Sequence, residues 1–578
     1  MERLLDFYKG MDLSFVPQCL DAGMVLRDRD GTPLDALSLA RAHGVNAVRL
    51  RLWNNPETVP ESGGYCSLAH TLAFGREIRK AGLSFLLDFH YSDYWADPAQ
   101  QRKPKAWESL HGAALEEAMY AFTRDTLLTL REGGAMPDMV QIGNEIRSGL
   151  LFPDGEAPDF ASIARLVNAG IRAARELGVA VMIHLDQGGR YSLVHDWFSQ
   201  AIAHGLADFD AIGLSYYPFW HGTFSDLKQS MDRLAADYGK PILLAETAYA
   251  WRLTPHGFID RAQERIAGFP ATPQGQRRVM DLVMNVCSSV PGRLGRGVFY
   301  WEPFCVPSAG VGGWAENMGI LREDGTALEA IEAFAFTRDR FRGAEIAKIY
   351  APPEQEIPVN GRISLPEELR ALAFDGTLHT IPVRWEVSPQ ELETACATPG
   401  THRFAGTVPG MAGQEVEAVA HTGARTARGR NLLQDPNWDE GFARWDLETS
   451  ESFVQAEIHP SFPDPFPAPP VNDVALRADR NFRLTLSQRV PVQPGRYRLE
   501  AEYRGVDTTN VDVRLVLQSG TATAETVIHP TEQEWQKSAA ELEVNTAGEL
   551  WAGLRVVSPP GTGSVRRFAL HALKEEEA

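Results

Sequence analysis

Residues 84–97 read SFLLDFHYSDYWAD and join two unlike halves in one short segment. The first half is the apolar run of a buried strand. The second half places His90, Tyr91, Asp93, Trp95 and Asp97 close together. A strand that only packs into a core does not need such a tail, because ligand sites are where aromatic rings and a few polar groups converge. The segment therefore predicts a buried strand that ends at a binding site.

The same design recurs along the first 340 residues. Apolar or β-branched runs occupy eight short ranges, namely 9–15, 46–53, 84–91, 139–146, 179–186, 210–217, 241–248 and 297–304. Amphipathic segments such as 67–82 and 159–178 lie between the runs, and both end at a glycine, a common helix stop. Strands that alternate with helices in this number predict an α/β fold, the (β/α)8 TIM barrel. A doubly wound open sheet is the rival, but no GxGxxG or GxxxxGK[ST] motif follows any run.

The composition changes after the barrel. Residues 350–410 are rich in proline, with short alternating runs split by Gly and Pro turns, and residues 431–578 contain longer runs of the same kind. Both patterns predict β-sandwiches. We therefore expect a catalytic barrel at 1–343, an Ig-like β-sandwich at 344–422 and a jelly-roll domain at 431–578.

Charge and cysteine content limit the classes of partner and the cellular compartment that we expect. Lys and Arg total 56 against 76 Asp and Glu, a net charge of −20, which argues against a nucleic-acid or anionic-membrane partner and favours a neutral substrate. No run reaches about 18 apolar residues, so we expect no membrane insertion. Five scattered cysteines without CxxC spacing, and no leader in the sequence as numbered, predict a cytoplasmic protein. Secretion, with a leader removed, is the alternative.

The ends of the barrel strands predict the site, because in this fold they form the active face. Aromatic faces stack on sugar C–H surfaces and short polar groups bond hydroxyls, so this mixture predicts a carbohydrate cleft. We expect substrate to be bound by Asp12, Arg49, Arg51, His90, Tyr91, Asp93, Trp95, Asp97, Asn144, Tyr217, Trp220 and Trp301.

Glu145 and Glu246 are the candidate catalytic pair. They end the fourth and seventh runs, which lie across a barrel mouth from one another. Glycoside hydrolysis needs one protonated and one ionised carboxyl group. Taken alone, either glutamate fits a barrel-mouth salt bridge equally well, but two of them among so many aromatics favour catalysis. Tyr217 can orient Glu246, and Arg49 can keep it charged.

Six blocks of the sequence carry a family resemblance. VRLRLWNNP, LLDFHYSDYWADPAQQRKPKAW, VQIGNEI, GLSYYPFWHGT, LLAETAYAW and GFPATPQGQ occur in this order between residues 7 and 340. Together they resemble glycoside hydrolase family 53, the endo-β-1,4-galactanases of clan A.

The resemblance implies a (β/α)8 barrel that cleaves type I galactan and arabinogalactan with retention. It implies that Glu145 is the acid/base and Glu246 the nucleophile, and that Arg49, His90, Tyr217 and Trp301 are the clan's other site residues. It implies no cofactor. Bacterial members often bind calcium after the seventh strand, but residues 252–276 offer only Asp260 and Glu264, so we expect no metal there.

Alternatives remain open at this stage. Another clan A β-glycanase, such as a xylanase or mannanase, would share both glutamates, and a catalytically silent galactan-binding protein is a second class. A cytosolic enzyme would trim galacto-oligosaccharides rather than polymer. The middle domain is similar to bacterial Ig-like spacers, and the C-terminal domain resembles jelly-roll carbohydrate-binding modules. Candidate sugar platforms there, each of which also suits a core, are Trp438, Trp445, Tyr497, Tyr503, Trp535 and Trp551.

Overall fold

The computed structural model divides the chain into two compact units. One holds residues 1–345 with 374–376, and the other holds 346–373 with 377–578. The structure describes residues 4–308, 310–352, 354–357, 359–411, 415–423, 431–438, 441–449, 455–461, 471–478, 482–506, 512–528, 535–558 and 561–573.

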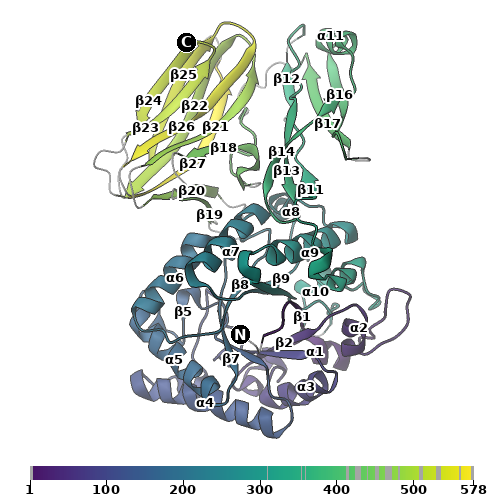
Figure 1. Cartoon of the computed structure of the whole chain (residues 1–578), viewed down its shortest axis with the longest axis vertical. Coiled ribbons are helices and arrows are strands. Elements are labelled where there is room, and N and C mark those ends of the chain that lie inside the picture. Colours follow the sequence, from purple (N-terminus) through teal and green to yellow (C-terminus); the bar gives the residue numbers. More distant parts are fainter. Residues whose placement is uncertain are drawn as a thin grey trace. The chain divides into compact units, whose positions relative to one another are not determined.

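Eight parallel strands close the first unit into a barrel, which confirms the predicted fold (Figure 1). The strands are β1 (Tyr8–Asp12), β2 (Ala47–Leu52), β3 (Ser84–Phe89), β4 (Met139–Ile142), β7 (Ala180–Leu185), β8 (Ala211–Ser215), β9 (Ile242–Thr247) and β10 (Gly295–Tyr300). Each pairs with its neighbours, and β1 pairs with both β2 and β10, so the sheet has no free edge. The eight predicted runs are these eight strands.

Helices surround the barrel and connect its strands. They are α1 (Val16–Asp21), α2 (Ala36–Ala42), α3 (Leu68–Lys80), α4 (Gly112–Glu132), α5 (Phe160–Glu176), α6 (Tyr191–Ala203), α7 (Phe224–Tyr238), α8 (Arg261–Ala267), α9 (Pro273–Ser288) and α10 (Trp314–Asn317). A two-stranded hairpin of β5 (Gly149–Leu150) and β6 (Gly155–Glu156) follows β4. No helix in the described part of the chain is long and apolar enough to span a membrane.

Local signals explain where the helices begin and end. The Ser67 hydroxyl accepts the backbone N–H of His70 at the start of α3, and the Asp159 carboxylate accepts that of Ser162 at the start of α5. Gly82 and Gly178, just beyond the two helices, have φ of 72° and 71°, the left-handed conformation that favours glycine. The polar caps and the glycines thus set where both predicted helices begin and end.

Side chains fill the barrel interior. Tyr8, Leu86, Met139, Met182 and Phe299 are each at most 1% exposed and belong to one cluster contributed by several strands. Such a barrel is a packed core rather than a pore. The space for a ligand therefore lies beyond the carboxyl ends of the strands.

The second unit contains two pairs of β-sheets. The first pair is β11 (Ile346–Ile349), β13 (Glu368–Ala373) and β14 (Leu378–Pro382) against β12 (Gln355–Ile357), β17 (Glu415–Thr422), β16 (Gly400–Thr407) and β15 (Arg384–Trp385). It also carries α11 (Pro389–Ala397), a helix within a stretch whose sequence pattern predicts only strands. Ser388 and Glu391 form a capping box there, with Pro389 at the first helical position.

The second pair consists of two five-stranded antiparallel sheets. One has the order β18 (Asp446–Thr449), β21 (Phe482–Val492), β26 (Gly548–Ser558), β23 (Asp512–Ser519) and β24 (Ala522–Ile528). The other has β19 (Gln455–Ser461), β20 (Val471–Ala478), β27 (Gly561–Ala572), β22 (Gly495–Val506) and β25 (Gln536–Val544). One hydrophobic core joins residues of both sheets.

Candidate active site

A cleft of about 650 Å³ lies at the carboxyl ends of the barrel strands, and both candidate catalytic glutamates line it. The other sequence-predicted residues on its wall are His90, Trp95, Asp97, Asn144, Tyr217, Trp220 and Trp301. They come from segments that follow β3, β4, β8 and β10. Closure of the barrel thus brings together residues that lie up to 211 positions apart in the chain.

Glu246 has a partner on each carboxylate oxygen. The Arg49 guanidinium lies 2.8 Å from Oε1, and the Tyr217 hydroxyl donates a hydrogen bond of 3.1 Å to Oε2. Burial raises the pKa of Glu246 to about 7, and the nearby Arg49 charge opposes a larger rise. Arg49 and Tyr217 therefore favour the ionised form of Glu246 and oppose the effect of burial.

Among the described residues, no cationic side chain pairs with Glu145 in this way. Its Oε1 accepts a hydrogen bond of 2.5 Å from the Ser215 hydroxyl. Burial raises the pKa of Glu145 well above its ordinary value, and the negative charges of Glu246 and Asp186 raise it further. Glu145 therefore holds a proton more tightly than Glu246 does, and this difference divides the acid role from the nucleophile role.

A directed chain of hydrogen bonds ends on Glu145. The backbone N–H of Glu145 donates to His184 Nδ1 at 3.4 Å and the Gln141 amide nitrogen lies 2.9 Å from it, which favours the tautomer with the ring proton on Nε2. His184 Nε2 then donates to Ser215 Oγ at 2.9 Å, which leaves the Ser215 proton for Glu145. The pKa of His184 is far below its ordinary value, first because of burial and then because of Arg49. A neutral imidazole therefore fixes the direction in which Ser215 donates.

The floor beneath Glu246 is built on buried charges. Arg49 is 1% exposed, and it pairs with Asp12 and Asp88 at 2.7 Å each as well as with Glu246. It also donates to Asn144 Oδ1 at 3.0 Å. A buried guanidinium needs several such partners, and through them Arg49 holds Glu246 and Asn144 in fixed positions.

Aromatic rings form the walls. Trp301 packs edge-on against Trp314 with centroids 4.2 Å apart, and Trp95 lies 5.9 Å from Trp301. Phe15 and Phe258 add two further rings to the lining. Aromatic faces beside a few polar groups suit a sugar ring better than a charged ligand.

His90 and Asp97 reach the cleft from the segment that follows β3. Trp53 Nε1 and the backbone N–H of Ala96 donate to His90 Nδ1, so His90 Nε2 carries the proton and faces Asp88 at 3.1 Å. Asp97 accepts from Gln100 and turns the chain back. Part of the tail after β3, namely His90, Trp95 and Asp97, therefore lines the cleft.

The structure does not bring Tyr91 and Asp93 to the cleft. Tyr91 has φ of 52°, is 1% exposed and bonds Thr123 on α4 at 2.8 Å, so it lies behind the strand against the helices. The Asp93 carboxylate accepts the backbone N–H groups of Asn55 and Lys105, which joins two loops. Alternation of side chains ends with the strand, so position alone could not place these two residues.

Asp12, Arg49 and Arg51 lie one layer too deep to line the cleft. Each is at most 2% exposed. Arg51 pairs with Glu302 at 2.5 Å, and its guanidinium stacks on the rings of Phe15 and Trp95 at 4.3 and 4.4 Å. These three residues therefore support the site from below rather than contact a substrate.

Sequence reasoning missed several residues of the site. Gln141 and Ser215 support Glu145, and both are polar residues inside otherwise apolar runs, which is a readable signal. Phe258 comes from the loop after β9 and Trp314 begins α10, both far beyond the strand ends, where no periodicity points to them.

Asp260 and Glu264 serve helix α8 and its surroundings. Asp260 accepts the backbone N–H of Gln263, and Glu264 accepts that of Ala271 and pairs with Arg261. In the described part of the chain, no three His, Cys, Asp or Glu side chains form a group that could hold a metal ion.

A (β/α)8 barrel with an aromatic cleft and two unequal carboxyl groups at its open end is a glycoside hydrolase. The chain belongs to glycosyl hydrolase family 53, whose family model matches residues 8–334.

Relatives and solved structures agree with this assignment. The chain is 34% identical to an arabinogalactan endo-β-1,4-galactanase of Thermothelomyces thermophilus, over 57% of this chain and 98% of the relative. It is 34% identical to an endo-β-1,4-galactanase of Bacillus subtilis (strain 168), over 52% and 71%. Among solved structures it is similar to the GH53 catalytic domain of Ignisphaera aggregans, with 36% identity and a TM-score of 0.55, covering 57% of this chain and 95% of that chain.

Proposed function

We propose that the protein is an arabinogalactan endo-β-1,4-galactanase that hydrolyses β-1,4-galactosidic bonds in type I galactan, arabinogalactan or galacto-oligosaccharides. The observation that carries the proposal is the shared cleft of Glu145 and Glu246, with a higher pKa at Glu145. The named activities of the Thermothelomyces and Bacillus relatives support the choice of substrate.

The mechanism is a double displacement. Glu246 attacks the anomeric carbon while Glu145 gives its proton to the departing O4, and a covalent galactosyl-enzyme forms. Glu145, now ionised, then removes a proton from water as the water attacks the anomeric carbon and releases Glu246. Arg49 and Tyr217 keep the Glu246 carboxylate charged and aimed, and the aromatic walls hold the sugar chain.

Product analysis tests the substrate. The full chain should release galacto-oligosaccharides from β-1,4-galactan and leave xylan and mannan intact. Proton NMR of the first products should show the β-anomer, as retention requires. Release of xylo- or manno-oligosaccharides at comparable rates would favour another clan A glycanase, and release of α-anomer would contradict the displacement.

Glu246→Gln tests the nucleophile. The variant should lose hydrolysis and still bind galactotetraose, because the amide keeps the shape but cannot attack. A variant that hydrolyses galactan at a substantial fraction of the wild-type rate would exclude Glu246 from this role.

We also propose that the enzyme acts in the cytoplasm, on the support of the scattered cysteine spacing. Galactanase activity in the cytosolic fraction of the producing cells would agree. Activity in the medium or periplasm would favour secretion.

A further inference from the structure

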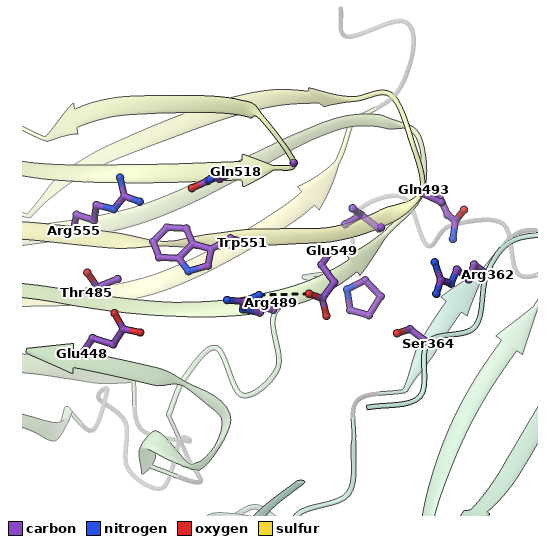
Figure 2. A pocket seen from close by; sticks show the side chains of 15 residues that line it. Arg362, Ser364, Glu448, Thr485, Arg489, Gln493, Gln518, Glu549, Trp551 and Arg555 are labelled. Atoms are coloured by element: carbon purple, nitrogen blue, oxygen red, sulfur yellow. Dashed lines mark ion pairs between the residues drawn. The ribbon is translucent and has the colours of Figure 1, made fainter. Parts of the chain in front are cut away.

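The aromatic candidates of the C-terminal domain are held by its core and by neighbouring guanidinium groups. Four of them are at most 3% exposed and belong to the core between the sheets, namely Trp438, Trp445, Tyr497 and Tyr503. Trp535 lies 3.9 Å from the guanidinium of Arg566, and Trp551 lies 5.2 Å from that of Arg555 on the same strand, β26 (Figure 2). The ladders to β21 and β23 also fix the backbone of Trp551. Two rings of the catalytic cleft have no such ladder.

These two rings, Phe258 and Trp314, pack together with centroids 4.9 Å apart and line the cleft. Phe258 is 39% exposed and lies in the loop between β9 and α8, and Trp314 begins α10, which has four residues. A Cβ atom on Gly312 would meet no atom within 4 Å, and one on Gly313 would meet only the His256 carbonyl oxygen, at 3.7 Å. A helix of one turn has little stability of its own, so tertiary contacts must place Trp314.

Asn317 joins the two segments that carry these rings. It ends α10 and is 0% exposed. Its side-chain amide donates to the Arg252 carbonyl oxygen at 3.1 Å, and its Oδ1 accepts the backbone N–H of Phe258 at 2.9 Å. Its own carbonyl oxygen accepts the backbone N–H of Trp251 at 3.0 Å. All three bonds connect α10 to the loop after β9.

The fit around the Asn317 amide is close. A Cβ atom on Gly257, the neighbour of Phe258, would come within 2.5 Å of Asn317 Nδ2 and 2.7 Å of Thr254 Oγ1. The loop therefore lies directly on the amide. Without this amide, the Phe258 N–H and the Arg252 carbonyl would lose their partners, which is costly for buried backbone groups.

Arg252 adds a second connection nearer the surface. Its Nε and Nη2 both donate to the Glu316 carbonyl oxygen at 3.2 Å, and its Nη1 pairs with Glu323. The side chain is 31% exposed. The loop after β9 and the segment around α10 are thus fastened once in the interior and once at the surface.

We propose that Asn317 is a positioning residue for substrate binding, which holds Phe258 and Trp314 together as one wall of the catalytic cleft. The substrate, β-1,4-galactan, rests on the proposed function of the barrel. Asn317 does not line the cleft itself, so it acts through the two rings. Loss of a wall that binds the ground state and the transition state equally raises KM and leaves kcat unchanged.

Kinetics of Asn317→Ala in the full chain test the proposal. The variant should raise KM for β-1,4-galactotetraose several-fold at unchanged kcat. Asn285→Ala is the matched control, because Asn285 on α9 is 2% exposed, donates to the Asp281 carbonyl at 2.7 Å and accepts the backbone N–H of Arg342 at 2.8 Å. It should lower the melting temperature and keep the wild-type KM.

A double-mutant cycle and hydrogen exchange show whether Asn317 acts through the wall. In a Phe258→Ala background, Asn317→Ala should raise KM by less than it does in the wild type, because residues that act through one contact are not additive. Amides of residues 251–260 should exchange faster in Asn317→Ala than in the wild type or in Asn285→Ala.

Arg252→Ala keeps the proposal testable if Asn317→Ala does not fold. It should raise KM less than Asn317→Ala, and Arg277→Ala should not raise it. Arg277 is a matched control, because it is 32% exposed, pairs with Asp281 at 2.9 Å and donates to the Glu329 carbonyl at 3.3 Å.

Three results would overturn the proposal. They are a wild-type KM in folded Asn317→Ala, an equal rise of KM in Asn285→Ala, and, where Asn317→Ala does not fold, a wild-type KM in Arg252→Ala. Each leaves galactan hydrolysis by the wild-type chain as evidence for the function of the barrel. A wild-type chain that does not hydrolyse galactan would overturn that function instead, and the exchange of residues 251–260 would still show whether Asn317 fastens the loop.

Discussion

Burial and acidic neighbours raise the pKa of Glu145, and the Ser215 hydroxyl opposes them. It donates to the carboxylate at 2.5 Å, and a hydrogen bond to a charged group is worth about 1.5–3 kcal/mol. The carboxylates of Glu246, Asp186 and Asp97 also act on Glu145 and raise its pKa. Arg147 pairs with Asp186 at 2.9 Å. Ser215 is thus a neutral group that favours the ionised form of Glu145 in a mostly acidic setting.

Ser215→Ala should therefore raise the pKa of Glu145, because the ionised form loses a donor. Glu145 acts as an acid only while protonated, so the alkaline limb of the kcat/KM profile should move to higher pH. Ser215→Thr keeps the hydroxyl and should restore the wild-type limb. A profile unchanged by Ser215→Ala, in a protein with normal melting behaviour, would show that the bond does not tune the acid.

The raised pKa of Glu145 also makes the stability of the folded protein depend on pH. In the unfolded chain a glutamate has a pKa of about 4.3. Because the folded pKa lies well above this value, stability is fully present at lower pH and is lost as pH rises toward the folded pKa.

Glu145→Gln removes this titration. The variant should therefore melt above the wild type, by a margin that grows between pH 5 and pH 8, at about 2–4 °C per kcal/mol. Calorimetry of the barrel transition measures it, with Glu132→Gln at an exposed position as the control. A margin that shrinks as pH rises would contradict the direction of the shift.

At the scale of elements, the segment after β3 divides into a part that faces the cleft and a part that fastens the strand. Tyr91 belongs to the second part through its bond to Thr123 on α4. Tyr91→Phe should lower the free energy of unfolding by about 0.5–1.5 kcal/mol and leave kcat/KM on galactotetraose unchanged.

Trp95→Ala is the contrasting change in the same segment. Trp95 lines the cleft, so this variant should raise KM. Denaturant unfolding and initial-rate kinetics of both variants test the division. A large fall in kcat/KM in Tyr91→Phe at unchanged stability would show that Tyr91 takes part in substrate binding.

The elements also show how far the sequence could predict the molecule. Parallel barrel strands are covered on both sides, so they read as unbroken apolar runs, and all eight could be found. The carboxyl ends of such strands share one face, which was enough to bring Glu145, Glu246, Trp95 and Trp301 together. Backbone conformation beyond a strand is set by tertiary contacts, so the outward turn at Tyr91 was not predictable.

The sequence also does not reveal how far below the cleft surface a strand residue is buried. Arg49 and Arg51 are on the correct strand and close to the correct end, but each is buried under a layer of other side chains. An inward-facing position in a barrel does not say which layer it occupies. Charged residues inside an apolar run therefore predict a polar centre, without separating its floor from its surface.

At the scale of the whole molecule, the barrel and the β domains have separate cores, and the catalytic cleft is lined entirely by residues 15–314. A chain that ends at residue 345 loses residues 374–376 of the barrel unit but keeps every residue that lines the cleft. It should therefore fold and hydrolyse galactotetraose with a kcat/KM within about twofold of the full chain.

Initial rates on galactotetraose measure the ratio of the two chains, and the melting curve of the truncated chain shows whether it has folded. If the truncated chain folds but loses activity on galactotetraose, residues beyond 345 contribute to the catalytic cleft, and the division of labour between the two units is wrong.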